Sequence, residues 1–198
     1  KLFDRTKYKF LKSKEQIETD TIEFKKKYES TIYKILDNIK NKKKLNFIHS
    51  GHCGDLIYAL PMVKELSKTH ECNFYIRSNK LMPVPYYRHP AGTVYVDDRI
   101  LKLFLPVLQS QKYIKKAAKY ENEEIDVDLD LFRKLPVNIL FNSPRWYFHI
   151  CGIQVDLSQP YMDVPPHEKI KNKIVIHRTF RYRNNFINYK FLSNYDEI

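Results

Sequence analysis

The chain is poor in glycine: only 4 of its 198 residues are glycine. Two of the four, Gly51 and Gly54, lie three positions apart in one loop, where a short apolar run meets a helical pattern. Because the rest of the chain avoids glycine, this placement predicts a sharp turn or a close approach to the backbone. The same loop ends on a carboxylate, Asp55. The loop is therefore the first candidate for a functional site.

Cysteine is scarce as well. Cys53, Cys72 and Cys151 are odd in number, widely spaced and without a Cys-x-x-Cys pair. This excludes a disulfide framework and a four-cysteine zinc site, and it makes a reducing cytoplasm the expected compartment. No run approaches the roughly 18 uncharged apolar residues of a membrane helix. The first residues also lack the apolar core of a signal peptide.

Charge is distributed unevenly. The formal net charge is +12, and residues 1–44 contribute 14 Lys/Arg against 7 Asp/Glu, which is more than half of the excess. Apolar residues recur there at spacings of three, four and seven, which predicts a helix from about Glu15 to Ile39. We interpret residues 1–44 as a basic helical extension with a solvated charged face. The alternative is peripheral contact with anionic lipid, at the inner face of the membrane, or with nucleic acid.

After residue 44, short apolar strands alternate with helical patterns. This alternation predicts an α/β fold with a Rossmann-like parallel sheet and flanking helices over residues 45–153, with Leu45–His49 as a central strand. Residues 154–172 are expected to be a linker, and residues 173–198 to begin a second, incomplete Rossmann-like domain that binds a nucleotide sugar. The expected strands are 45–49, 72–77, 93–96, 125–131 and 173–177, and the expected helices are 56–67, 98–119 (interrupted near Pro106) and 144–150 (ending at Gly152).

Two groups of polar residues are candidates for metal binding. Asp126, Asp128 and Asp130 alternate with apolar residues, and three carboxylates on one face suit a divalent cation. We favour a second interpretation, in which like charges protect a solvent-facing strand edge from pairing. Adjacent residues of one short loop rarely converge on a single ion, which argues against zinc at the glycine loop. No metal is therefore expected, although that loop holds His49, His52, Cys53 and Asp55.

The glycine loop does not fit common nucleotide-binding motifs. A dinucleotide fingerprint starting at Gly51 needs glycines at positions 53 and 56, and a P-loop needs Gly-Lys-Ser/Thr at positions 56–58. What remains is a carboxylate, Asp55, in the first turn of a helix at the C-terminal end of a strand, where open α/β sheets place their ligands. Asp55 is expected to cap the helix, to act as a general base or ligand contact, or to do both.

The segment Ser50-Gly51-His52-Cys53-Gly54-Asp55 and the apolar helix that follows it to Pro61 resemble the N-terminal signature of ADP-heptose:lipopolysaccharide heptosyltransferases. A second segment, residues 174–184, is similar to the strand and Thr/Arg-bearing loop that open the second Rossmann-like domain of that family. The two segments stand in the family's order, with a linker between them.

The resemblance implies a GT-B glycosyltransferase that needs no metal or other cofactor. Such an enzyme transfers a sugar from a nucleotide-sugar donor to a saccharide or glycolipid acceptor with inversion. Asp55 falls on the position of the catalytic base, which takes the proton from the acceptor hydroxyl. Permanently charged guanidinium groups suit the departing diphosphate. The other implied substrate-binding residues are Ser50, Gly51, Gly54, Thr179, Arg181 and Arg183. Since most of the second domain is absent, we expect the 198 residues alone to be inactive.

Two other functions stay open. Positive charge and aromatic rings interleave between Arg178 and Phe191, as in proteins that bind single-stranded nucleic acid. No RNA-recognition, KH or zinc-finger signature accompanies this stretch, so nucleic acid is the less favoured partner. The third function is that of a non-catalytic, glycosyltransferase-like scaffold, because a fold does not determine an activity. We favour glycosyl transfer.

Overall fold

The computed structural model describes residues 4–83, 91–135, 144–164 and 190. Contacts divide the chain into two units, Lys1–Asp163 and Val164–Ile198. The predicted strand 173–177 and the stretch Arg178 to Phe191, except Lys190, lie outside the described residues. The domain boundaries at residues 44, 153 and 172 stay predictions. The description below concerns the first unit.

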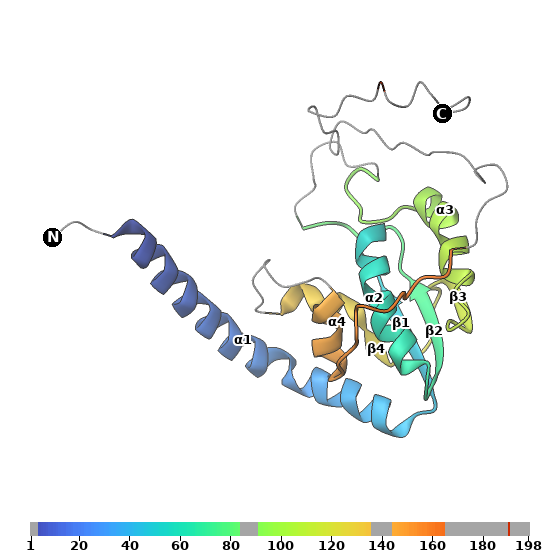
Figure 1. The fold of residues 1–198 in the computed structure, drawn as a ribbon, viewed down its shortest axis with the longest axis horizontal. Helices are drawn as coiled ribbons and strands as arrows, with labels where there is room; N and C mark the ends of the chain where they lie inside the picture. Colours follow the sequence, from blue (N-terminus) through green and yellow to red (C-terminus); the bar gives the residue numbers. More distant parts are fainter. Residues whose placement is uncertain (1–3, 84–90, 136–143, 165–189, 191–198) are drawn as a thin grey trace. The chain divides into compact units, whose positions relative to one another are not determined.

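Four parallel strands form the sheet, in the order β3-β2-β1-β4. Helices α2 and α3 connect β1 to β2 and β2 to β3, which confirms the Rossmann-like α/β fold (Figure 1). Strand β1 lies inside the sheet, as predicted, with Lys44 paired to Glu71 and His49 to Ile76 on the β2 side. The elements of the sheet layer are β1 (Lys44–His49), α2 (Cys53–Leu66), β2 (Glu71–Ile76), α3 (Asp98–Gln109), β3 (Lys116–Lys119) and β4 (Val127–Asp128).

The core lies between the sheet and α2. Leu45 and Phe47 of β1 are fully buried, together with Leu56, Leu60 and Val63 of α2. Leu45 and Phe47 alternate along β1 and belong to the apolar core, whereas the side chain of the intervening Asn46 accepts a hydrogen bond from Asn73 on β2 (2.9 Å). His49, at the end of the strand, is a buried polar residue on the same face as Leu45 and Phe47.

The order of the strands reverses after β3. Strands β2 and β3 are added on one side of β1, while β4 pairs with its other side through Phe47 and Ile48. The connection over residues 120–126 returns across the sheet, where Asn46 Nδ2 donates a hydrogen bond to the Glu124 carbonyl (2.8 Å). The β1/β4 boundary is thus the topological switch point, and in open α/β sheets ligands bind at the carboxyl ends of the strands at such a point.

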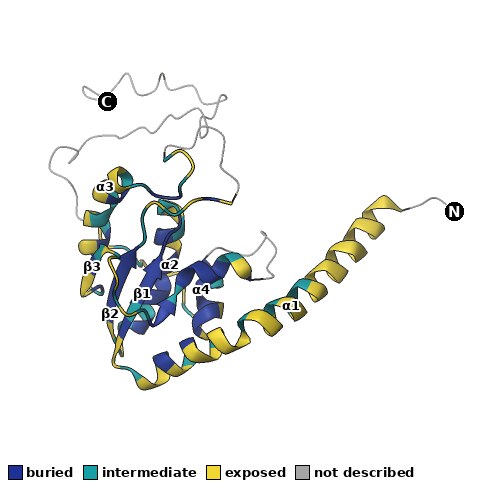
Figure 2. Ribbon diagram, turned by 180° about the vertical axis from the view of Figure 1, so that it is seen from behind, coloured by how far each residue is buried: buried dark blue, intermediate teal, exposed yellow. Residues whose placement is uncertain are grey.

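Helix α1 (Arg5–Asn41) has 37 residues and begins ten positions before its predicted start. Asp4 caps it by accepting the N–H groups of Thr6 and Lys7. Only the C-terminal half packs on the sheet layer, where Ile35 and Asn38 are buried, and the earlier turns are exposed (Figure 2). Contact of the basic exposed turns with an anionic membrane stays a prediction. No helix of the described residues is long and apolar enough to cross a membrane.

Two predictions of secondary structure after residue 92 are wrong. The helix expected over 98–119 ends at Gln109, shortly after Pro106, and Lys116–Lys119 pairs with β2 as an edge strand. The Lys-Ala-Ala-Lys sequence of β3 favours helix by propensity. Residues 93–96 form no strand in a sheet; a turn there makes one isolated antiparallel bridge between Leu81 and Val94.

The strand expected over 125–131 is also shorter than predicted. Only Val127 and Asp128 pair with β1, and the chain then turns into a 3-10 helix, η1 (Leu129–Lys134). Asp128 causes the turn by accepting the N–H of Asp130 (2.9 Å). The next helix, α4 (Pro144–Cys151), was predicted correctly, including Gly152 just past its end.

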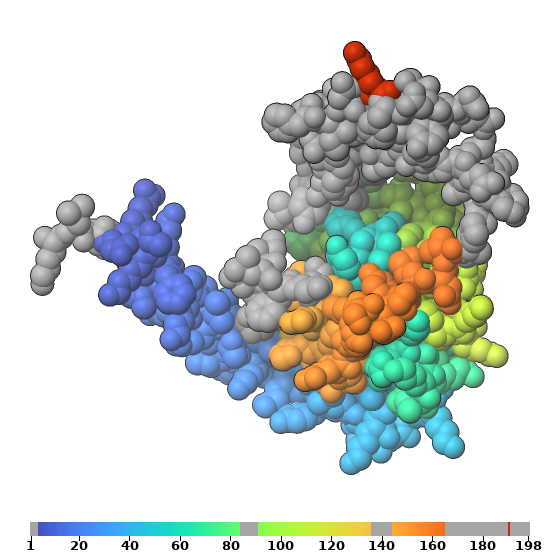
Figure 3. Space-filling model, in the orientation of Figure 1, coloured from blue at the N-terminus to red at the C-terminus, as the bar shows by residue number. Residues whose placement is uncertain are grey.

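The segment that follows α4 runs along the outside of the helical layer (orange in Figure 3). Lys64 of α2 donates to the Pro160 carbonyl (2.7 Å), and Tyr113 donates to the Tyr161 carbonyl (2.6 Å). The N–H of Asp163 donates to Gln111 Oε1 (2.9 Å). Residues expected to act as a linker are therefore bonded to the sheet domain as far as Asp163.

Gly152→Ala should destabilise the domain more than Gly92→Ala. Both glycines have positive φ (63° and 66°), a conformation that costs an alanine about 1–2 kcal/mol. A Cβ at Gly152 would also lie 2.8 Å from Leu36 Cδ2, whereas a Cβ at Gly92 meets nothing within 4 Å. Urea unfolding of the two variants measures the difference. Equal losses would show that the contact between α4 and α1 tolerates the added methyl group.

Candidate functional site

The glycine loop leaves β1 at the switch point. Strand β1 ends at His49, and three residues then lead into α2, which begins at Cys53. Beyond β4, η1 brings Asp130 and Arg133 to the same loop. The site is therefore built from the ends of the two strands between which the sheet reverses its order, and Ser50 and Asp55 contact the η1 residues directly.

Asp55 is the third residue of α2, and His52 is the N-cap. The Asp55 Oδ2 atom accepts the N–H of His52 (3.1 Å), so the side chain supports the start of the helix from inside the first turn. The same oxygen accepts from Arg133 Nη2 (3.0 Å). Within the described part of the chain, no hydrogen bond reaches Oδ1, and the Asp55 side chain is 22% exposed. One carboxylate oxygen is held and the other is open.

The two glycines of the loop have different reasons to be glycine. Gly51 is buried, and a Cβ there would lie 2.6 Å from Arg133 Nη2, Asp55 Oδ2 and His49 Cε1. Gly51 is therefore required by the close approach of the site's own side chains. Gly54 is exposed in the first turn of α2, and a Cβ there meets nothing within 4 Å. Packing within the described part of the domain therefore gives no reason for a glycine at position 54.

Asp130 is buried and connects several parts of the site. Its carboxylate accepts the N–H of Ser50 (3.0 Å), the Ser50 hydroxyl and Lys80 Nζ (2.6 Å). It also accepts Arg133 Nη1 (2.7 Å). Burial raises the pKa of Asp130, but its interactions with His49, Lys80 and Ser50 outweigh burial and hold the pKa well below its usual range.

His49 is fully buried and completes a second set of bonds around the loop. The N–H of Gly51 donates to His49 Nδ1 (2.8 Å). His49 Nε2 lies 2.8 Å from the Tyr147 hydroxyl of α4, and that hydroxyl donates to the Asp55 carbonyl (3.1 Å). Burial raises the pKa of Tyr147 above its usual range, which keeps it a donor. The backbone on both sides of Gly51 is thus fixed.

Two aromatic rings contact Arg133 in addition to the groups bonded to its nitrogens. Its guanidinium carbon lies 4.3 Å from the ring centroids of Tyr95 and Phe132. A guanidinium that contacts two rings and two carboxylates loses little further freedom when a ligand binds. Arg133 therefore sets the orientation of Asp55.

The structure brings together some of the predicted site residues. Ser50 and Gly51 lie in the loop after β1, and Gly54 and Asp55 lie in the first turn of α2, whereas Thr179, Arg181 and Arg183 lie outside the described residues. Sequence reasoning missed Lys80, Arg133 and Tyr147, which help to hold Asp55 and its loop in place, because they are distant in sequence and carry no local motif. Asp130 was considered only as a metal ligand or an edge charge, and not as a partner of Arg133.

The interpretation of the acidic run as a solvent-facing edge is wrong. Asp126 and Asp130 are 7% and 8% exposed. Lys42 binds Asp126 (2.5 Å), while Lys80 and Arg133 bind Asp130, so cations from elsewhere in the chain compensate for burial. In the sequence, the alternation of Asp126, Asp128 and Asp130 with apolar residues was the signal that these carboxylates are partly or fully buried. Among the described residues, no group of three His, Cys, Asp or Glu side chains is placed to hold a metal ion.

Gly51→Ala and Gly54→Ala should have opposite effects on stability. The Gly51 variant should lose about 1–3 kcal/mol, because the added methyl group overpacks the contacts of Asp55 and Arg133. The Gly54 variant should be unchanged or more stable by up to about 1 kcal/mol, since alanine favours helix and has free space. Chemical denaturation of both variants tests this. Destabilisation by Gly54→Ala would contradict the assignment.

Asp130→Asn should flatten the acid dependence of stability. A carboxyl whose folded pKa is depressed contributes stability above its unfolded value of about 3.8, and loses it as pH falls toward the folded value. The variant should lose stability at neutral pH, toward the lower end of the roughly 3–5 kcal/mol for breaking a buried ion pair. The loss should shrink as pH falls below about 4.

Melting curves between pH 2 and pH 7, compared with the wild type, measure this effect. Ser50→Ala is the matched control, because it removes one hydrogen bond and leaves both ion pairs of Asp130. It should keep most of the wild-type acid dependence, because Lys80 and Arg133 still hold the carboxylate while only the Ser50 hydrogen bond is lost. A difference between Asp130→Asn and wild type that stays constant with pH would contradict the coupling.

Comparison with known proteins gives no match. No family model, curated protein or solved structure is significantly similar to this chain. The resemblance to heptosyltransferases therefore rests on residues 50–61 and 174–184 alone.

Proposed function

We propose that the chain carries the acceptor-side domain of an inverting glycosyltransferase in which Asp55 is the general base. The proposal rests on the hydrogen bonding of the Asp55 carboxylate at the β1/β4 switch point. One oxygen is fixed by His52 N–H and Arg133, and the other accepts no hydrogen bond from the described residues. A general base needs such a positioned oxygen within reach of the substrate hydroxyl.

In the proposed reaction, Asp55 Oδ1 takes the proton from an acceptor hydroxyl as that oxygen attacks the anomeric carbon of the donor sugar. The bond between that carbon and the diphosphate oxygen breaks, and its electron pair leaves with the diphosphate. Attack from the side opposite the leaving group inverts the anomeric configuration. The acceptor is a saccharide or glycolipid hydroxyl, and the donor is a nucleotide sugar.

The charges around Asp55 support an acceptor site rather than a diphosphate site. Lys80 and Arg133 are balanced by Asp130 and Asp55, so the cluster has no excess positive charge. A neutral hydroxyl fits this balance, and a diphosphate needs cations from elsewhere. By the family resemblance these are Arg181 and Arg183. The exposed Gly54 leaves space at the N-terminal turn of α2 for a substrate.

The alternative, a non-catalytic scaffold, is favoured by one observation. The bonds of Asp55 to His52 N–H and Arg133 give an aspartate a structural role at this position without any chemistry. The two functions differ in what happens when the carboxylate is replaced by an amide, because an amide oxygen still accepts the His52 N–H.

Asp55→Asn in the full-length protein should lower sugar transfer by roughly 10²–10⁴-fold, because the amide cannot accept the proton. The change also removes the ion pair with Arg133, which is partly exposed and worth at most about 1 kcal/mol. Arg133→Met removes the same pair and keeps the base, but it also breaks the ion pair with Asp130, so its activity is a lower limit for an enzyme that has lost only the Asp55 pair. Mass spectrometry with a panel of nucleotide sugars and acceptors gives the rates, and melting curves report the fold.

The difference in transfer activity between the two variants tests whether Asp55 is the general base. Asp55→Asn should be far less active than Arg133→Met, although Arg133→Met should have the lower melting temperature because it also leaves Asp130 without one of its cations. Equal activity of the two variants would leave Asp55 with only its structural role. Activity of Asp55→Asn equal to that of the wild type would contradict glycosyl transfer through this residue.

A further inference from the structure

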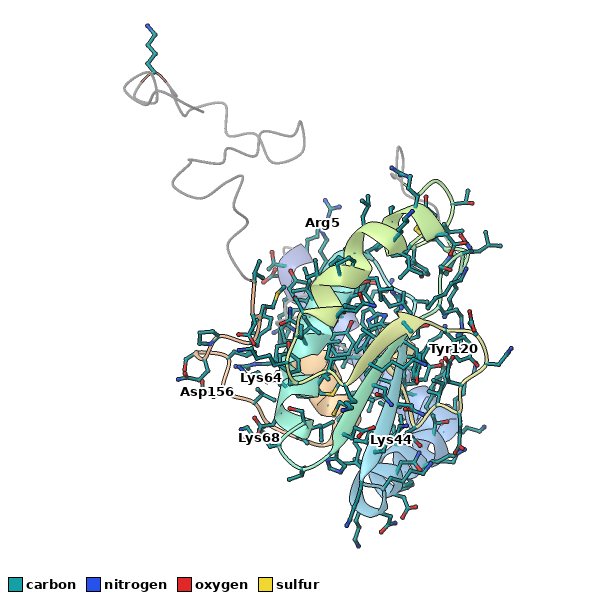
Figure 4. All side chains as sticks on the ribbon, turned by 90° about the vertical axis from the view of Figure 1, so that its right-hand side faces the viewer. Arg5, Lys44, Lys64, Lys68, Tyr120 and Asp156 are labelled. Atoms are coloured by element: carbon teal, nitrogen blue, oxygen red, sulfur yellow. The ribbon has the colours of Figure 1, made fainter. Side chains whose placement is uncertain are left out.

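The N-terminal half of α1 is exposed along most of its length. The helix begins at Arg5 (labelled in Figure 4), and the first of its apolar residues to pack against the core is Phe24. Between these two residues only Asp20 and Thr21 are partly buried, and the others are exposed (yellow in Figure 2). We call residues 5–23 the arm. With about 1.5 Å of rise per residue, the arm is about 28 Å long.

The arm repeats the apolar pattern of the half of α1 that packs on the domain. Phe10 and Ile17 precede Phe24 at steps of seven residues, close to two helical turns, so the three side chains share one face of α1. Phe24 packs against the core, whereas Phe10 is 67% exposed and Ile17 is 39% exposed. An amphipathic helix gains most of its stability from the packing of its apolar face. On the arm, no described element covers this face.

The charges of the arm are divided into two blocks. The basic block, residues 5–14, holds five cations and no acid, and the acidic block, residues 15–23, holds four acids and no cation. The cations are Arg5, Lys7, Lys9, Lys12 and Lys14, and the acids are Glu15, Glu18, Asp20 and Glu23. None of these charges forms an ion pair with a described residue. Each arm therefore presents two adjacent surfaces of opposite sign.

Two such arms are complementary only when they run antiparallel. In a parallel pair the two basic blocks would face each other, and so would the two acidic blocks, which is unfavourable. In an antiparallel pair each basic block faces the acidic block of the other copy. The two blocks are of similar length, so both copies make the same contacts around a two-fold axis. The charge pattern of the arm is thus complementary to itself.

One register satisfies the apolar residues and the charges together. When Phe10 lies opposite Ile17 of a second copy, two-fold symmetry also places Ile17 opposite Phe10. Residues 5–14 then lie opposite residues 13–22, which contain three of the four acids of the acidic block. Arg5 lies opposite Ile22, so the second helix ends before Phe24, where α1 begins to pack on its own domain. The second copy therefore covers the length that the domain leaves exposed.

We propose that the arm is a self-association surface that pairs antiparallel with the arm of a second copy of this chain. Phe10 packs against Ile17, and the basic block lies against the acidic block. Burial of the apolar residues favours association, and the charges determine the orientation and the choice of partner. A contact confined to one helix from each copy is small, so the dimer should be reversible at micromolar concentrations.

An anionic membrane or a nucleic acid fits the arm less well than a second copy does. Either of them attracts the basic block but repels the acidic block that follows it on the same helix. A second copy supplies both signs in the required order. It also supplies an apolar face for Phe10 and Ile17, which a nucleic-acid backbone lacks.

This inference does not depend on glycosyl transfer at Asp55, because it concerns α1 and is tested by association alone. Sedimentation velocity of the full-length protein at increasing concentration should show an equilibrium between monomer and dimer. The dimer should dissociate more readily at about 0.5 M salt than at about 0.05 M salt, since salt screens exposed charges.

Exchange of the charges in one block should weaken dimerisation by about tenfold or more, because like charges then face each other along the whole arm. The basic-block variant carries Lys7→Glu, Lys9→Glu and Lys12→Glu, and the acidic-block variant carries Glu15→Lys, Glu18→Lys and Asp20→Lys. A combined variant with all six changes should dimerise again, since it restores two blocks of opposite sign. Failure of the combined variant to regain the dimer would contradict the pairing.

The matched control has the same change of charge outside the arm. It carries Lys40→Glu, Lys43→Glu and Lys102→Glu, three exposed lysines that form no ion pair with a described residue. This control should dimerise as the wild type does. Melting curves of all variants should agree closely, because the exchanged residues of the arm lie outside the core.

Disulfide formation tests the orientation of the two arms. Ser13 lies beside the two-fold axis of the antiparallel pair, so Ser13→Cys should link the two copies under mild oxidation more than the wild type does. Thr6 lies opposite residue 21, about 22 Å along the helix from Thr6 of the second copy, so Thr6→Cys should not form this link. Stronger linkage through Thr6→Cys than through Ser13→Cys would indicate a parallel pair and overturn the proposal.

Three further results would overturn the proposal. The first is a protein that stays monomeric up to about 0.5 mM, far above the micromolar range expected. The second is a dimer that neither block variant weakens. The third is a monomer that binds anionic vesicles or an oligonucleotide through the basic block, which would assign the arm to that partner.

Discussion

The buried carboxylate of Asp130 holds together segments that lie far apart in the sequence. Ser50 follows β1, Lys80 follows β2, and Arg133 belongs to η1, yet all three donate to Asp130. An ionised group inside a protein is tolerated only when donors satisfy it, and removal of one member leaves the others uncompensated. Because Arg133 in turn holds Asp55, the geometry of the candidate base depends on a side chain that a substrate would not touch.

The turn at Leu129 divides the carboxylates between two faces of the sheet. In a regular strand, side chains two residues apart share a face, so Asp128 and Asp130 would lie together and repel each other. The 3-10 turn breaks this period, and the bond from Asp130 N–H to Asp128 stabilises it. As a result Asp130 binds Ser50 of the glycine loop, while Asp128 lines a hollow together with Ile48 and Arg77.

Sequence reasoning succeeded where the determinant was local and failed where it was not. The central strand, its glycine loop and the end of α4 at Gly152 follow from short patterns of apolar residues, glycine and proline. Strand β3 has a helical composition and becomes a strand only by pairing with β2. The same holds for the site: Asp55 stands next to glycines and was found, whereas Arg133, 78 residues away from it, has no motif. Such partners are selected by the fold and are visible only in three dimensions.

The two-residue strand β4 has a consequence for how the site is assembled. Strands β1 and β2 meet across a short helical connection, but β4 joins β1 only after about 80 intervening residues, and it brings one short ladder. Loop closure over such a separation favours this pairing as a late step of folding. Because its ladder has only two paired positions, we expect local opening here once the bonds of Asp130 are broken. We therefore expect the domain to visit a state in which β1, β2 and β3 remain paired while β4 and η1 detach. In that state Asp55 has lost Arg133, so the sheet would be intact but the site would be absent.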